Sequence, residues 1–352
     1  MIANFGWITI LCFLVGFCCD FPSKLMSLND TKNCTTEVQA GIYRIDELLK
    51  IIQHKKVGLV VNHSSRIGNI HLVDTLQKSG VNIQFIFAPE HGFRGNEDAG
   101  KHISSNIDSS TQIQVKSLYG KNYKPNKSDI TQLDILVFDI QDVGVRFYTY
   151  ISTLHYVLEA CAENKIPAIV LDRPNPNGHY IDGPVLDTSF SSFVGLHPIP
   201  VVYGMTIAEL AGMMKGECWI NDCDQLQLTT IRCKEYDRRK MYDLNVEPSP
   251  NLKELKAILL YPSLCFFEGT QISVGRGTDY PFMIYGHPSF KSDFKFTPGS
   301  KAGASNPPWK NVLCYGYDLR KLPITELHKK KQIEIKYILK AYRELGNQDS
   351  FF

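Results

Sequence analysis

Short apolar segments rich in β-branched residues alternate with segments of helical periodicity over the first half of the chain. Each apolar segment has the length of a strand and ends in polar or glycine-rich sequence. Continuous apolar runs of this kind are typical of parallel strands that are covered on both faces. The segments predicted as strands are residues 57–62, 83–91, 113–120, 133–142 and 168–178.

Two of the intervening segments have clear helical periodicity. Residues 71–80, "HLVDTLQKSG", predict a helix that Gly80 closes as a C-cap. Residues 149–165 place Ile151, Leu154 and Leu158 on one helical stripe. Strands alternating with helices favour an α/β fold with a parallel sheet and helices on both faces. Right-handed crossovers then bring the carboxyl ends of all strands to one edge of the sheet.

The regular alternation of strand and helix patterns ends near Met205. A helix in "TIAELAGMMKG" leads into mixed segments with proline-rich breaks at "VEPSPN" and "LLYPS". We therefore predict a sheet domain over residues 38–204 and a smaller α+β domain over residues 205–352. The chain ends soon after the amphipathic segment "IEIKYILKAYREL", and we expect that further sequence would complete the second domain.

The N-terminus carries an apolar run over residues 5–17, which is too short for a membrane span and has the place of a secretory signal. We expect residues 1–19 to be a leader, with cleavage near Cys18 or Cys19. A cysteine there could carry a lipid, so the predicted location is the periplasm or cell envelope. Cys218 and Cys223 flank "WIND" and could form a local disulfide after export.

Several functional classes lack their sequence signals. The formal charge of +2 comes without a clustered basic face, so we predict no nucleic-acid partner. No G-x-G-x-x-G, G-x-x-x-x-G-K-[ST] or G-x-S-x-G stands at a strand exit, which argues against a dinucleotide, a nucleotide and a hydrolase triad. The cysteines show no zinc spacing, and Glu90, His91, Asp98 and His102 match no metal-ligand pattern. We predict neither a metal nor a cofactor.

Polar groups follow four of the predicted strands, and we expect them to meet at the common edge. Carboxylates, arginines, tyrosines and amides of this kind suit a polyhydroxylated, anionic ligand. The second domain adds "FEGTQISVGRGT", whose glycines allow a close approach of the backbone to a ligand. The candidate residues are Asn62, Glu90, His91, Arg94, Asp142, Arg146, Tyr148, Asp172, Arg173, Glu268 and Arg276.

Glu90 leaves its strand between Pro89 and Gly92 and is the best placed acid. Cleavage of a glycosidic bond needs a protonated carboxyl group against the leaving oxygen, and burial favours the protonated form. The plainer interpretations are a loop ion pair of Glu90 with Arg94, and a hairpin in which Glu268 and Arg276 pair with each other.

Several long motifs recur in order between about Gly41 and Tyr342: "APEHGFRG", "VFDIQDVGVRFYTYISTL", "LDRPNPNG", "PIPVVYGMTIAEL", "PSPN", "LLYP" and "FEGT…GRGT". Together they resemble the NamZ family of exo-acting β-N-acetylmuramidases. The resemblance implies a Rossmann-like domain, a smaller second domain and an active site in the cleft between them. It also implies removal of terminal N-acetylmuramic acid from the non-reducing end of peptidoglycan fragments. Unlike the family pattern, "NVEPSPN" lacks a tryptophan before the serine–proline pair.

By motif, Glu90 matches the catalytic glutamate of that family, and His91 and Glu268 would stand beside it. Arg94, Asp142, Arg146, Tyr148, Arg173 and Arg276 fall in the other shared motifs and would line the pocket. Asn62 and Asp172, at the strand exits, complete the predicted substrate-binding set. One arginine would bind the lactyl carboxylate of muramic acid. Glu268, Asp142 or the acetamido group of the substrate would serve the anomeric centre. The alternative is a non-catalytic lipoprotein that binds muropeptides or sugars.

Overall fold

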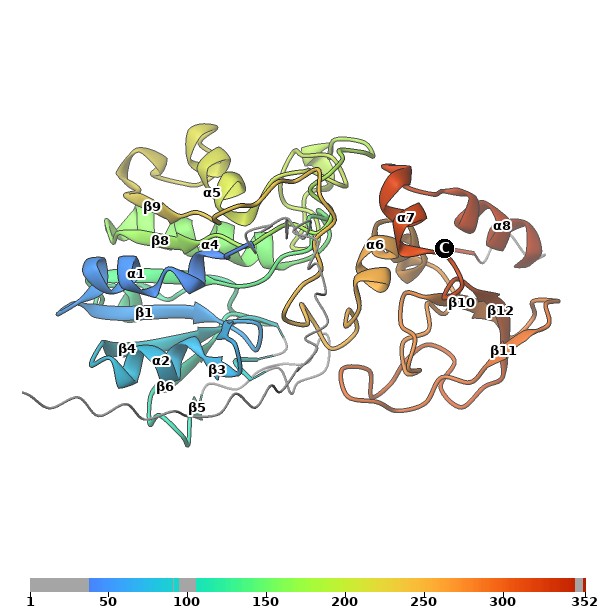
Figure 1. Cartoon of the computed structure of the whole chain (residues 1–352), viewed down its shortest axis with the longest axis horizontal. Coiled ribbons are helices and arrows are strands. Elements are labelled where there is room, and N and C mark those ends of the chain that lie inside the picture. Colours follow the sequence, from blue (N-terminus) through green and yellow to red (C-terminus); the bar gives the residue numbers. More distant parts are fainter. Residues whose placement is uncertain (1–37, 91, 95–105, 346–350) are drawn as a thin grey trace, which may run out of the picture. The chain divides into compact units, whose positions relative to one another are not determined.

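A seven-stranded sheet forms the centre of the computed structural model, which describes residues 38–90, 92–94, 106–345 and 351–352 (Figure 1). The strand order is β5-β6-β4-β1-β7-β8-β9, and every pairing is parallel except that of β5 with β6. The five predicted strands are confirmed. The strands are β1 (Lys56–Val61), β4 (Asn82–Ala88), β5 (Asn106–Ile107), β6 (Gln114–Ser117), β7 (Ile135–Asp139), β8 (Ala168–Leu171) and β9 (Leu228–Ile231).

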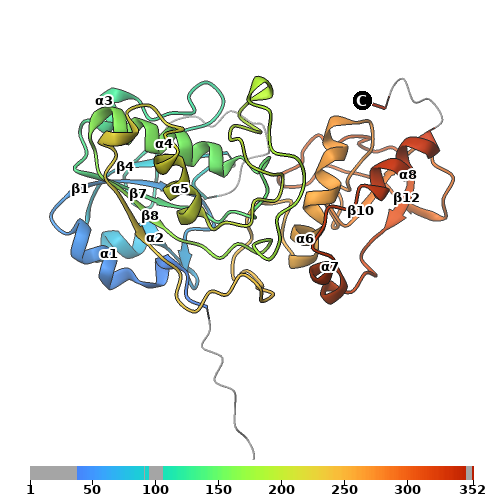
Figure 2. The ribbon, with the colours of Figure 1, turned by 90° about the horizontal axis from the view of Figure 1, so that it is seen from above.

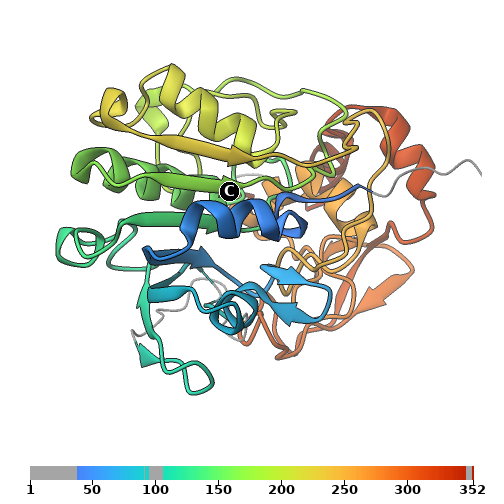
Figure 3. The same cartoon turned by 60° about the vertical axis from the view of Figure 1, so that its left-hand side comes forward.

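Helices cover both faces of this sheet, as the alternation in the sequence predicts. Figure 2 shows α1 (Ile45–Ile52) and α2 (Leu72–Lys78) on one face, and α4 (Tyr150–Asn164) and α5 (Ile207–Gly216) on the other. In Figure 3, α1 crosses in front of the strands. Side chains of β1 divide between the two faces: Leu59 joins the core under α1, and Val60 joins the core under α4.

The helix boundaries follow the local sequence. Gly80, two residues after α2, has φ +75°, a left-handed conformation that favours glycine. Thr206 and Glu209 form a reciprocal capping box at the start of α5. The short helical elements of this domain are η1 (Gly41–Tyr43), α3 (Lys127–Ile130), η2 (Thr188–Phe190) and η3 (Cys223–Gln225), and β2 (Arg66–Ile67) pairs with β3 (Ile70–His71).

The predicted domain boundary at residues 204/205 lies too early in the chain. Strand β9 completes the sheet beside β8, and Leu210 and Ala211 of α5 belong to the core of that sheet. The boundary was misplaced because β9 is a short edge strand with half-exposed residues, which has a weak apolar signal.

A smaller second domain follows, as predicted, with its own three-stranded antiparallel sheet in the order β10-β12-β11. Its elements are α6 (Leu255–Leu264), η4 (Cys265–Gly269), β10 (Ile284–His287), β11 (Phe294–Phe296), β12 (Cys314–Asp318), α7 (Ile324–Lys330) and α8 (Lys336–Leu345). The fold is therefore α/β with a second α+β domain.

Cys218 and Cys223 form the predicted disulfide, with their Cα atoms 5.3 Å apart. Among the described residues, the group with metal-ligand spacing consists of these two cysteines and Asp224, and the disulfide occupies both sulfurs. No helix in the described part of the chain has the length and apolar character needed to span a bilayer. The predicted leader, residues 1–19, lies outside the described residues.

Candidate active site

A cavity of about 190 Å³ lies beside the carboxyl ends of the strands and is lined by both domains. The sheet domain contributes Glu90 after β4, Tyr119 after β6, and Tyr148–Tyr150 at the start of α4. The second domain contributes Tyr261 of α6, Glu268 of η4 and Arg276 of the loop that follows η4. The other lining residues are Phe147, Phe193, Val194, Ser249, Asn251, Leu252 and Phe282.

Glu90 enters this cavity directly from β4. Its side chain is half-buried, and Thr149 donates a hydrogen bond from Oγ1 to Oε2 over 3.2 Å. Tyr119 lies beside the same carboxyl group in the cavity lining, and burial together with the charge of Glu90 raises the pKa of Tyr119 above its ordinary range. Thr149 therefore holds the Glu90 carboxyl group at the cavity, with the Tyr119 hydroxyl group as its neighbour.

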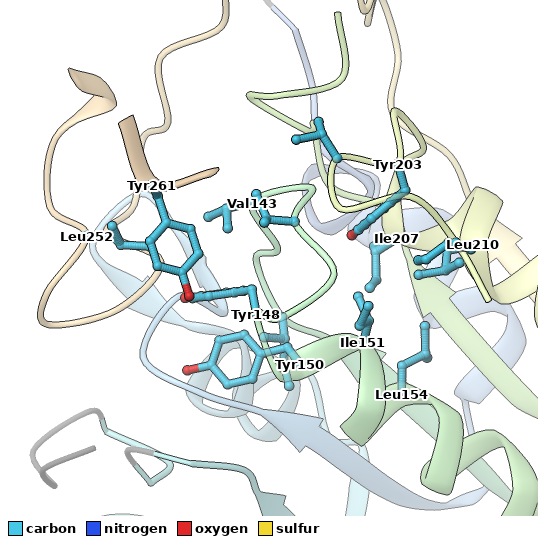
Figure 4. Close-up of a cluster of buried hydrophobic side chains, with 14 of the residues drawn as sticks. Val143, Tyr148, Tyr150, Ile151, Leu154, Tyr203, Ile207, Leu210, Leu252 and Tyr261 are labelled. Carbon is cyan, nitrogen blue, oxygen red and sulfur yellow. The ribbon is translucent and has the colours of Figure 1, made fainter. Parts of the chain in front are cut away.

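Three tyrosines form the inner wall of the cavity. Figure 4 shows Tyr148, Tyr150 and Tyr261 next to one another, and the ring of Tyr148 lies 5.0 Å from Tyr150 and 6.0 Å from Tyr261, both edge to face. Burial, and then the nearby charge of Glu90, raises the pKa of Tyr150.

Several polar atoms around this wall have no hydrogen-bond partner within the described structure. They include the buried hydroxyl groups of Tyr148 and Tyr150 and the Nδ2 group of Asn62. Ser249 is the polar neighbour of Tyr148, and Asn62 is that of Tyr150. An unpaired buried polar group costs about 1–3 kcal/mol, so their presence indicates a place for a polar ligand.

Glu268 and Arg276 form an ion pair at the cavity, with 2.5 Å between Oε1 and Nε. Cys265 Sγ lies 3.3 Å from the other Glu268 oxygen, and the Arg276 guanidinium lies 5.1 Å from the ring centre of Phe282. Burial lowers the pKa of Arg276, but the attraction of Glu268 outweighs it and leaves this pKa raised. Glu268 and Arg276 therefore pair with each other and also line the cavity.

The two Nη groups of Arg276 donate to no side chain or carbonyl of the described residues. They remain available to an anionic ligand group, for which a guanidinium provides parallel donors.

Six predicted ligand-binding residues lie outside the cavity lining. Most of their polar atoms are hydrogen-bonded to other groups of the protein. Three of them are buried within the sheet edge. Arg173 makes two 2.7 Å bonds to Asp139 and a third bond to the carbonyl of Ser64. Asp172 Oδ1 accepts from the backbone N–H of Ala208 at the start of α5. Asp142 Oδ2 accepts from the backbone N–H of Gly144 and from the hydroxyl group of Tyr203.

The other three predicted residues, Asn62, Arg94 and Arg146, make hydrogen bonds that hold loops in place. Arg146 donates to the carbonyls of Pro184 and Ile199, and Asn62 Oδ1 accepts from its own turn at Ser64. Arg94 makes two hydrogen bonds to Asp108. Among the described residues, its closest ion-pair partner is therefore Asp108 and not Glu90, as the plainer interpretation of Glu90 had it. His91 lies outside the described residues.

The sequence interpretation brought Glu90, Tyr148, Glu268 and Arg276 into one site but did not select other lining residues. Tyr119 lies near the end of the third predicted strand, residues 113–120, and just after the observed β6, so its place at a strand exit was the available signal. Thr149, Ser249 and Asn251 lie within quoted motifs, yet small polar residues of this kind also occur in ordinary turns. Phe193 lies in a loop that carries no pattern of its own.

Comparison with known proteins agrees with this arrangement over most of the chain. Residues 57–256 match the N-terminal domain, and residues 259–351 the C-terminal domain, of "Exo-beta-N-acetylmuramidase NamZ". The chain is similar to the peptidoglycan beta-N-acetylmuramidase NamZ of Bacillus subtilis (strain 168), with 43% identity over 306 residues. That alignment spans 81% of this chain and 70% of the relative.

Two crystal structures of DUF1343 family proteins from Bacteroides fragilis NCTC 9343 are also similar. One has a TM-score of 0.83 and 45% identity, and covers 90% of this chain and 86% of its own. The other has a TM-score of 0.75 and 28% identity, with 88% and 82% covered. The motifs, the two-domain fold and these matches show that the chain belongs to the NamZ family of exo-β-N-acetylmuramidases.

Proposed function

We propose that this chain is an exo-acting glycoside hydrolase that releases N-acetylmuramic acid from the non-reducing end of peptidoglycan fragments. The observation that carries the proposal is the Glu90 carboxyl group, hydrogen-bonded by Thr149 and beside Tyr119 in a cavity that also contains the Glu268–Arg276 pair. Family membership and the similarity to the Bacillus subtilis enzyme support the same activity.

Glu90 acts as the general acid in this proposal. Its proton passes to the oxygen of the leaving sugar as the glycosidic bond breaks and positive charge develops at the anomeric carbon. Glu268, the second carboxylate of the lining, stabilises that charge. Water adds to the anomeric carbon and releases a proton, so the products are free N-acetylmuramic acid and the shortened glycan. Asp142 is less suited to this role, because it is buried outside the lining and binds Tyr203 and Gly144.

Arg276 binds the lactyl carboxylate in this proposal. It is the arginine of the cavity lining, and its Nη groups have no partner among the described residues. A cavity of about 190 Å³ is smaller than the roughly 300 Å³ at which pockets for drug-sized ligands begin, which suits one terminal sugar better than an internal stretch of glycan.

The test is release of N-acetylmuramic acid from a synthetic muramoside. Glu90→Gln should lower the rate at least about a hundredfold, as expected for loss of a general acid. Glu326→Gln, which changes an exposed glutamate of α7, should retain the wild-type rate. Equal rates for wild type and Glu90→Gln would remove Glu90 from this role. Binding of the glycan without cleavage by the wild type would instead support the non-catalytic alternative.

We also propose that the chain is exported and that its leader carries a lipid on Cys18 or Cys19. The Cys218–Cys223 disulfide supports export, because disulfides persist in oxidising compartments. Cell fractionation with labelled palmitate tests both statements. An unprocessed cytoplasmic protein would contradict export, and processing without label would contradict the anchor.

A further inference from the structure

A row of aromatic side chains leads out of the cavity. Tyr119 and Phe193 belong to the cavity lining, and their ring centres are 6.1 Å apart. Phe193 stacks on Tyr123 at 4.0 Å, and Tyr123 lies outside the lining. All three side chains are half-buried, so each keeps part of its surface open.

This aromatic row ends at a second hollow, of about 490 Å³, which Tyr123 also lines. Lys121, Lys124 and Lys127 are its cationic residues, and Glu163 is its acidic residue. Lys124 is paired with Glu159 and Glu163, at 2.8 and 2.6 Å. Lys121 and Lys127 form no ion pair with any described residue, so the hollow offers two unneutralised ammonium groups.

The direction of this row relative to Glu90 is fixed by contacts. Tyr119 lies beside Glu90 in the cavity lining, whereas the buried Tyr148 and Tyr150 stand on the inner side of the cavity. A general acid stands at the bond that breaks, so the terminal sugar occupies the inner side. The leaving portion of the substrate then passes Tyr119 and follows the aromatic row outward.

We propose that Tyr119, Phe193 and Tyr123, with Lys121 and Lys127, form an extended binding site for the leaving portion of the glycan. The inference rests on the proposed function. Sugar rings present apolar C–H faces that pack on aromatic rings, and the first leaving sugar lies against Tyr119 and Phe193. The next sugar reaches Tyr123 and the lysine-lined hollow, where an acidic sugar places its carboxylate near the two ammonium groups. The preferred substrate is therefore longer than a disaccharide.

The anchoring of Phe193 gives this site a defined shape. Ser152, in the first turn of α4, donates a 2.7 Å hydrogen bond to the carbonyl of Phe193. Tyr156, one turn further along α4, lies parallel to the Phe193 ring, with 6.4 Å between ring centres. Helix α4 therefore carries Tyr150 at the cavity and also contacts Phe193. These contacts fix the position of the aromatic row relative to the cavity.

The experiment compares kcat/KM for a disaccharide and for a tetrasaccharide with alternating N-acetylmuramic acid and N-acetylglucosamine. Wild type should favour the tetrasaccharide. Tyr123→Ala should lower the tetrasaccharide value about three- to tenfold, the loss of one ring contact, and leave the disaccharide value within about twofold. Lys121→Gln with Lys127→Gln should lower the tetrasaccharide value by about threefold at low salt and less at high salt.

Tyr43→Ala and Lys78→Gln, at exposed positions outside both hollows, should change neither value. Equal kcat/KM for the two glycans in wild type, or an equal loss on both in Tyr123→Ala, would overturn the inference and leave the proposed function intact. If wild type cleaves neither glycan, the proposed function fails. Calorimetry then tests the site: tighter binding of the tetrasaccharide that depends on Tyr123 supports it, and equal binding overturns it.

Discussion

Removal of the Arg173 guanidinium should destabilise the fold rather than weaken substrate binding. Arg173 and Asp139 are almost completely buried, and two bonds of 2.7 Å join them. Arg173→Met leaves the Asp139 carboxylate buried without its cationic partner. Breaking a buried pair in this way costs about 3–5 kcal/mol. For a chain of 352 residues, an unfolding entropy of about 2.1 cal/mol/K per residue converts this cost into a thermal midpoint lowered by about 4–7 °C.

Differential scanning fluorimetry and steady-state kinetics on the same preparation test this prediction. Arg173→Met should show the lower midpoint, with KM for a muramoside within about twofold of wild type at a temperature where it is folded. The double variant Arg173→Met/Asp139→Leu should recover part of the loss, because no lone charge stays buried. Arg239→Met, which breaks the surface pair of the exposed Arg239 with Asp237, is the matched control and should not shift the midpoint. A wild-type midpoint combined with a strongly raised KM would show that Arg173 binds substrate.

Three further perturbations address single contacts. Tyr119→Phe removes the hydroxyl group beside Glu90 and should lower kcat about tenfold in the muramoside assay, and an unchanged kcat would contradict a role for that hydroxyl group. Arg276→Met should reduce the preference for free N-acetylmuramic acid over N-acetylglucosamine about 10- to 100-fold in equilibrium binding, and an unaltered preference would exclude a lactyl contact. Burial raises the pKa of Asp142 from 3.8 to about 6, so this group stabilises the native state most below pH 3.8 and loses that contribution as pH rises through 6. The stability of wild type relative to Asp142→Asn should therefore fall by up to about 3 kcal/mol between pH 4 and 7 in urea titrations, and a constant difference would contradict the raised pKa.

The sheet could be predicted because its strands carry the signal in their own residues. The run over residues 133–142 is apolar on both faces, and the structure buries all of β7. Strand β9 was not predicted from the sequence. Its residues "LTTI" lie at a sheet edge, where two are half-exposed and one is exposed, so the segment has no continuous apolar pattern. The shape of the second domain was predictable only in outline, since its three strands are short and separated by long loops.

The site was harder to predict than the fold, because the role of a polar residue depends on partners that are distant in sequence. Arg173 and Arg276 both lie within family motifs, and nothing local distinguishes them. Arg173 meets Asp139, 34 positions away, and its Nε and Nη2 groups are bonded within the protein. Arg276 meets Glu268, eight positions earlier in η4, and keeps its Nη groups for a ligand. Glu90 was predictable because the apolar strand before it fixes where the chain emerges.

The edge of the sheet therefore serves two purposes that look alike in sequence. Buried polar residues such as Asp142 and Asp172 satisfy backbone N–H groups where strands end and helices begin. Others, such as Glu90, leave that layer and line the cavity. Only the three-dimensional arrangement separates the two groups.

A crystal structure of Glu90→Gln with an uncleaved disaccharide of N-acetylmuramic acid and N-acetylglucosamine tests the central assignment most directly. We expect the glycosidic oxygen within about 3 Å of the side-chain amide at position 90 and the lactyl carboxylate beside Arg276. A disaccharide bound elsewhere, or in this cavity with its glycosidic oxygen far from position 90, would contradict it.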